Sequence, residues 1–67
     1  MKIILTDAEK QDLERQHKKE RDGRIKDRIK AVLLDNEGWS QMQIAQALRI
    51  RPETVHDHLE AFKRTES

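Results

Sequence analysis

The segment WSQMQIAQALRIRPETVHDHLEAF, residues 39–62, decides how this chain folds. Ser40 and Gln43 stand three residues apart, which is the spacing of a capping box, so a helix is predicted to begin there. Pro52 suits the first turn of a helix but not its interior, so a second helix is predicted to begin at Pro52. The residues between the two helices, 48–51, leave room for a tight turn only. The segment is therefore predicted to form a helix-turn-helix.

Apolar residues recur at helical spacing in both predicted helices, which gives each helix one face to bury. These residues are Ile44, Ala45 and Leu48 in the first helix and Val55, Leu59 and Phe62 in the second. The small side chain of Ala45 lets the second helix cross closely, with Val55 packed against it, and Ile50 fills the turn. A plain helical hairpin inside a bundle would show the same pattern, so the apolar spacing alone does not establish a function.

Two further helices are predicted upstream of this segment. Thr6 and Glu9 form a second capping-box pattern, so the first helix begins there. Gly23 can end this helix and Asp22 can cap the next one, whose own end is marked by Gly38. The second helix carries an apolar stripe formed by Ile25, Ile29, Val32 and Leu33. We expect helices at about 7–20, 24–36, 40–48 and 52–63.

The chain of 67 residues is expected to form a single all-α domain, residues 1–67. Its last three helices would build a homeodomain-like trihelical unit, with the first helix as an added layer. The apolar segment at residues 2–5 has two candidate roles: it covers the core as an extended tail, or it pairs with its copy in a homodimer. Core cover is the role we favour.

Composition excludes several classes of protein. Charged residues make up 40% of the chain and aromatic residues 3%, so the core has to be aliphatic and helical. The absence of cysteine excludes disulfides and thiolate metal sites. The longest apolar runs, 3–5 and 31–34, are far too short to span a membrane, and no signal peptide is recognisable. We therefore expect a cytoplasmic protein with no membrane partner.

Basic and acidic residues are unevenly distributed along the chain. Residues 1–30 contain ten Lys/Arg and seven Asp/Glu, a net charge of +3, whereas residues 31–67 contain four and six, a net charge of −2. The helix-turn-helix is thus mildly acidic. This counts against binding to DNA by simple electrostatic attraction through the last helix alone.

A helix-turn-helix can place its second helix in the major groove of double-stranded DNA, and this is the function we favour. Arg51 could then donate to guanine, and Glu53 or Asp57 could accept from cytosine. The residues expected to face base edges are Arg51, Glu53, Thr54, His56 and Asp57. Protonation of His56 would offset the local acidity, so we expect tighter binding at about pH 6 than at about pH 8.

Contacts to phosphates are predicted at the start of the motif and in its turn. Ser40, Gln41 and Gln43 lie at a helix N-terminus, which favours a phosphate, and Arg49 would contact the backbone from the turn. The alternative is that several of these polar residues are only helix caps and solvated groups.

A second source of affinity for the DNA backbone is predicted upstream. Arg24 and Arg28 stand one turn apart at the start of the second helix, which in trihelical DNA-binding proteins crosses the phosphate backbone. The alternative is that they form only surface ion pairs with Glu20 or Asp27, worth at most about 1 kcal/mol each.

The histidines do not predict a metal site. His56 and His58 point roughly 200° apart around a helix, and His17 is remote in sequence, so they are not placed to hold one ion. No pair of carboxylates is framed by a sequence that forms a pocket. We therefore expect no metal, no cofactor and no catalytic residue.

Many of these residues resemble a known family. The matching positions are Arg28 to Leu34, Glu37 to Ser40, Gln43 to Ala45, Ala47, Leu48, Thr54, Val55, Leu59 and Phe62, together with Leu5 to Glu9, Leu13 and Glu14. Over about residues 4–63, the chain resembles the N-terminal helix-turn-helix of bacterial mariner-like insertion-sequence transposases.

The resemblance implies that the chain recognises transposon ends. In that family a separate C-terminal domain with an Asp/Glu triad cuts DNA using magnesium; these residues hold no such domain, so the chain is expected to be the DNA-binding part and not an enzyme. Two positions depart from the family. Arg49 stands where the family usually has glycine, and a positive φ there would strain an arginine. His58 stands where the family often has tryptophan.

Two other functions stay open on the sequence alone. A stand-alone transcriptional regulator would use the same helix-turn-helix to bind DNA. A helical dimerisation or interaction module would not bind DNA and would present the acidic last helix to a partner.

Overall fold

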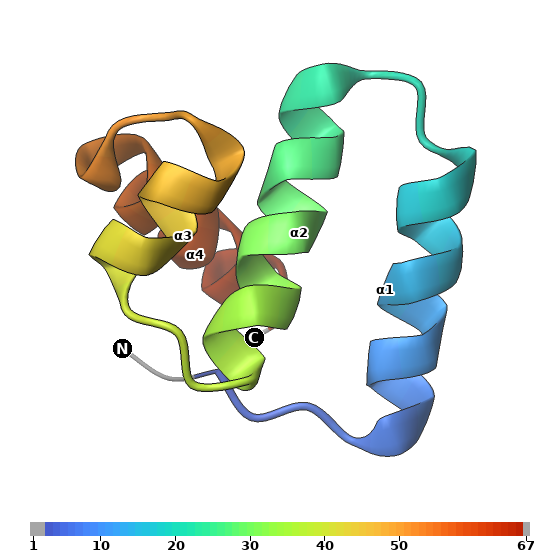
Figure 1. The fold of residues 1–67 in the computed structure, drawn as a ribbon. Coiled ribbons are helices and arrows are strands. Elements are labelled where there is room, and N and C mark those ends of the chain that lie inside the picture. The colour runs from blue at the N-terminus through green and yellow to red at the C-terminus, as the bar shows by residue number, and fades with distance from the viewer. Residues whose placement is uncertain (1–2, 67) are drawn as a thin grey trace.

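The computed structural model describes residues 3–66, with the side chains of residues 3–64. Over these residues the fold consists of helices without strands, as Figure 1 shows. The helices are α1 (Asp7–Lys19), α2 (Gly23–Asn36), α3 (Gln41–Leu48) and α4 (Pro52–Glu66). The prediction of an all-α fold with four helices in this order is confirmed. The largest difference in helix ends is at α4, which continues to Glu66 instead of ending near residue 63.

The helices are arranged around α2. Figure 1 shows α1 running antiparallel to α2 on one side, with α3 and α4 on the other. Within the described residues, α1 packs on α2 alone, whereas α3 and α4 pack on α2 and on each other. The last three helices therefore form one packed unit, and α1 is a layer added to it.

Local capping explains where α1 and α3 begin. At α1 the Glu9 N–H donates to Thr6 Oγ1 at 3.1 Å and the Thr6 N–H donates to Glu9 Oε1 at 3.0 Å. At α3 the Gln43 N–H donates to Ser40 Oγ at 3.1 Å and the Ser40 N–H donates to Gln43 Oε1 at 2.9 Å. Both predicted capping boxes are confirmed. Each satisfies two amides that have no partner inside the helix.

The connection between α1 and α2 is partly as predicted. Asp22 caps α2, because its Oδ1 accepts from the Arg24 N–H at 2.9 Å. The prediction that Gly23 ends α1 is wrong: α1 is capped at Glu20, and Gly23 is the first residue of α2. At the other end of α2 the prediction holds. Gly38 adopts φ +99°, which suits a residue without a Cβ atom.

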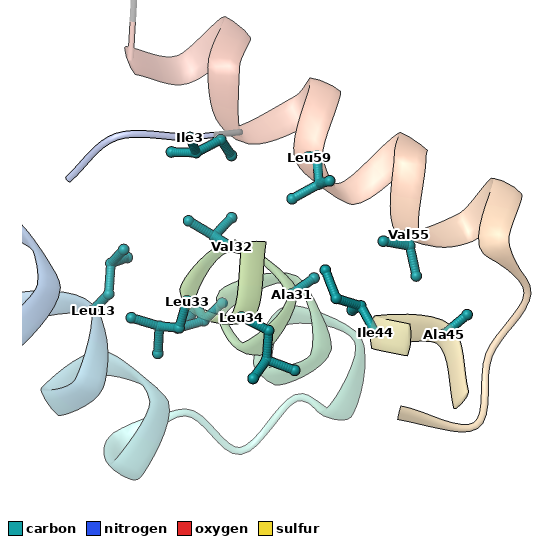
Figure 2. Packing of buried hydrophobic residues seen from close by; sticks show 11 residues of the cluster. Ile3, Leu13, Ala31, Val32, Leu33, Leu34, Ile44, Ala45, Val55 and Leu59 are labelled. Atoms are coloured by element: carbon teal, nitrogen blue, oxygen red, sulfur yellow. The ribbon is translucent and has the colours of Figure 1, made fainter. Parts of the chain in front are cut away.

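The core lies where α2, α3 and α4 meet. Figure 2 shows side chains from all three helices pointing toward one another, with Leu13 of α1 and Ile3 at the edges. The side chains with no exposed surface are Ala31, Val32, Ile44, Val55 and Leu59. Leu48, Ile50 and Phe62 are partly buried against this cluster. The predicted apolar faces of α3 and α4 are therefore confirmed.

One member of the predicted α2 stripe is wrong. Ile25 is 40% exposed, although Ile29, Val32 and Leu33 are buried. Ile25 lines an open groove together with Leu13 of α1 and Phe62 of α4. Because α1 and α4 do not pack against each other, the first turns of α2 are left partly uncovered.

The N-terminal segment covers the core, as predicted. Ile3 is buried, its N–H donates to Asp35 Oδ2 at 2.6 Å, and its carbonyl accepts from Asn36 Nδ2 at 3.0 Å. The carboxylate of Asp35 is itself buried and gains a partner in this way. Lys2, the other end of the predicted segment, lies outside the described residues. Pairing of this segment with a second copy stays a prediction.

Candidate nucleic-acid interface

The turn between α3 and α4 is built on a left-handed residue. Arg49 adopts φ 58° and ψ 43°, and the Ile50 N–H donates to the carbonyl of Ala45 at 3.0 Å. Arginine thus adopts here the positive φ that a glycine at this position would adopt without strain. A left-handed conformation costs a residue with a Cβ atom roughly 1–2 kcal/mol. The buried Ile44 and Ala45 on one side and Val55 on the other hold the turn in this conformation.

The α4 outer face is the side of this helix turned away from the core. It consists of Glu53, His56, Asp57, Glu60 and Arg64. Four of these recur at i, i+4, i+7 and i+11, so they lie along one face of the helix. Apart from the half-buried Glu60, all are exposed. Three carboxylates and one guanidinium make this face acidic, as the charge distribution of the sequence indicates.

The start of α3 lies beside the α4 outer face. Gln41 Nε2 is 3.4 Å from His56 Nδ1, and His56 Nε2 is 3.9 Å from Glu60 Oε1. Gln41, Glu53, His56 and Asp57 line a shallow open hollow of about 300 Å³, with Pro52. The structure therefore brings together one residue predicted to contact phosphate and three predicted to contact bases. Thr54 is half-buried next to them.

Some of the polar side chains at the start of α3 already form hydrogen bonds within the protein. The oxygen atoms of Ser40 and Gln43 accept the hydrogen bonds of the capping box. The groups at this helix N-terminus without a partner inside the helix are the backbone amides of Gln41 and Met42. Ser40 and Gln43 thus serve as caps, which was the alternative role considered for them.

The arginines of the turn and of α2 lie in different surroundings. Arg49, Arg51 and Arg24 are exposed. Arg28 is half-buried and lines the groove between α1 and α4, and its Nε atom has no hydrogen-bond partner. Arg24 and Arg28 therefore do not form one exposed cationic pair. Among the described side chains, neither forms the ion pair with Glu20 or Asp27 that the sequence left open.

His58 is a buried residue of the interface between α4 and α2. Burial lowers the pKa of His58, and the positive charges of Arg28 and Arg24 lower it further, while Asp27 and Asp57 act in the opposite direction. The neutral imidazole is therefore favoured in the folded protein. The spacing of the sequence could have revealed this burial, because residue 58 lies on the same helical face as Val55 and Leu59.

Other kinds of site find no support in the described part of the chain. No group of three or more His, Cys, Asp or Glu is placed there to hold a metal ion. No helix among these residues has the length and hydropathy needed to cross a membrane. Comparison with known proteins gave no match to a family model, to a curated protein or to a solved structure.

Proposed function

We propose that this protein binds double-stranded DNA in a sequence-specific manner through the helix-turn-helix formed by α3 and α4. The observation that carries the proposal is the geometry of this pair. The buried Ala45 of α3 precedes a left-handed turn at Arg49, and the polar outer face of α4 lies beside the start of α3. In helix-turn-helix DNA-binding proteins the second helix enters the major groove while the first crosses the backbone, and this pair supports the same placement here.

Each part of this surface has a chemical role in the proposal. The free amides of Gln41 and Met42 bind a phosphate at the start of α3, because a helix N-terminus favours negative charge. Arg49 contacts the backbone from the turn. Arg51, at the start of α4, donates to guanine.

The biological target follows from the resemblance described above. A chain of this kind would recognise the ends of a mobile DNA element, and a separate catalytic domain would cut the DNA. A transcriptional regulator would use the same surface on a different target. The sequence that the protein selects separates these two roles. The end of a mobile element would indicate the first role, and an operator would indicate the second.

The experiment that tests the proposal is selection of bound sequences from random duplexes. We expect enrichment of one motif, followed by saturable binding of that duplex. Trp39 is the only tryptophan of the chain and lies just before α3, so its fluorescence can follow the titration. Recovery of random sequence, with no saturable binding of any duplex, would refute the proposal.

Two arginine variants separate base reading from positioning. Arg51→Ala should lose preference at one base pair, about 1–3 kcal/mol, while Arg49→Ala should weaken matched and mismatched duplexes alike. Arg15→Ala is the matched control, because Arg15 is exposed on α1 and carries the same charge. Equal losses on both duplexes for Arg51→Ala would remove this residue from base reading.

A second candidate function is favoured by the acidity of the α4 outer face. A helical interaction module would use Glu53, Asp57 and Glu60 to bind a basic partner or a second copy. Selection from random duplexes would then enrich nothing, and sedimentation would detect an oligomer if the partner is a second copy.

A further inference from the structure

We infer that Glu53 and Asp57 determine which bases α4 accepts, and that they select cytosine at two positions of the contacted strand. The inference rests on the proposed function and specifies its target. On α4, the helix proposed to read DNA, carboxylates stand where basic side chains would bind DNA more tightly.

Glu53 and Asp57 are available for contacts outside the protein. Both are exposed, and among the described residues neither forms a hydrogen bond or an ion pair. Glu60 differs, because it is half-buried and its Oε1 lies 3.9 Å from His56 Nε2. The two free carboxylates also share the hollow with Gln41 at the start of α3. They therefore stand at the part of α4 closest to the proposed phosphate contact.

The spacing of the two residues matches the spacing of bases. Positions i and i+4 of a helix are separated by about 6 Å along its axis. Successive bases of one strand are about 3.4 Å apart, so the two side chains reach bases roughly two steps apart. Each carboxylate therefore faces its own base pair.

A carboxylate is an acceptor only, and this restricts the base it can face. In the major groove cytosine offers the N4 amino donor alone, whereas guanine and thymine offer acceptors and adenine offers a donor beside the N7 acceptor. A carboxylate opposite guanine or thymine loses its water without gaining a partner. The two residues thus reject wrong bases as well as accept the right one.

The same charges reduce binding to DNA of any sequence. Non-specific affinity comes from attraction between cations and phosphates, and carboxylates on the reading helix oppose it. The protein is therefore expected to bind random DNA weakly and to depend on correct base contacts. This explains why an acidic helix can be an advantage to a protein that has to distinguish its target.

The test uses Glu53→Gln and Asp57→Asn, which keep the shape and remove the charge. Selection with the parent chain should yield cytosine at two positions about two steps apart. Each variant should lose about 10-fold or more of the preference at one of them, and the double variant should bind a scrambled duplex more tightly than the parent does. Glu14→Gln is the control, because Glu14 is an exposed carboxylate on α1. Thermal melts should show that all variants fold.

The outcomes separate the inference from the function on which it rests. If the parent enriches a motif without the two cytosines, or if the variants keep the parent's preference, the inference is wrong and DNA binding stands. If neither parent nor variants enrich any duplex, the proposed function fails and the inference fails with it. Binding of a basic protein that is lost in both variants would then assign these carboxylates to the interaction module.

Discussion

The two helix pairs of this protein are built in different ways. Between α3 and α4, the side chains of Ile44, Val55 and Leu59 have no exposed surface, and Ala45 is almost as deeply buried. On α1, Leu13 is the only buried residue. The helix-turn-helix therefore packs around side chains without exposed surface, whereas α1 contributes one buried side chain to the core. The start of α3 and the α4 outer face have to be held in a fixed position relative to each other if they are to bind one partner. The packing between α3 and α4 holds them so.

The largest expected effect is the loss of stability when one buried side chain is truncated in α3 and, for comparison, one in α1. Ile44→Ala should cost about 3–5 kcal/mol, because its site is enclosed by three helices and cannot collapse. Leu13→Ala should cost about 2 kcal/mol, at the low end for such a change, because the groove beside it is open. Urea unfolding of both variants measures the difference. Equal losses would show that α1 is as integral to the fold as α3.

The next effect tests the close crossing of α3 and α4. Ala45→Leu should destabilise the fold by about 1–3 kcal/mol, because the added side chain would separate the two helices. Ala47→Leu is the matched control, since Ala47 lies on the same helix but is exposed. Thermal unfolding followed by circular dichroism should show a lower midpoint for the first variant only. Similar midpoints would mean that the crossing has room for a larger residue.

A third prediction is that the stability of the fold depends on pH through His58 and His17. Burial lowers the pKa of His58, and burial with the charges of Lys26 and Lys30 lowers that of His17. The unfolded chain, with histidines near pKa 6.5, binds more protons than the folded one below this pH. The stabilising contribution of each neutral histidine is therefore complete above about pH 6.5 and is lost as the pH falls below it.

Unfolding at about pH 7.5 and about pH 5 measures this loss. His58→Gln should make stability less dependent on pH, and His17→Gln should act in the same direction. A parent chain that is equally stable at both pH values would contradict the prediction.

The smallest expected effect is at the left-handed turn. Arg49→Gly should stabilise the fold by up to about 1 kcal/mol, because the relief of strain exceeds the added freedom of the unfolded chain. Arg51→Gly should not stabilise it, since Arg51 is not among the residues with positive φ. Denaturant midpoints of the two variants decide the matter. A loss of stability in Arg49→Gly would mean that the arginine side chain makes contacts that outweigh its backbone strain.

Features that depend on residues close together along the chain were predictable from the sequence. Ser40 with Gln43 and Thr6 with Glu9 are three residues apart, and the helix geometry itself brings such partners together. Gly23 was assigned wrongly because glycine is acceptable both after one helix and at the start of the next. The N-cap predicted at Asp22 already places Gly23 at the start of α2.

Features that depend on the angle between helices were not predictable. Ile25 belongs to the apolar stripe of α2, but α1 and α4 do not pack on each other over it, and it is left 40% exposed in the groove between them. For the same reason Arg28, one turn from Arg24, lines the groove and is half-buried. A stripe predicts which face of a helix turns inward, but the neighbouring helices decide how far along its length that face is covered.

The sequence by itself determined the four helices, the capping boxes at Thr6 and Ser40 and the acidity of α4, because each depends on residue types and short spacings. Only the tertiary structure decided that the buried Asp35 accepts a hydrogen bond from Ile3, 32 residues away, and that His58 faces the arginines of α2. Contacts across such separations require the chain to be packed first, since the geometry of one helix does not specify its partner. The same packing places Gln41 beside His56 and so creates the surface proposed to read DNA.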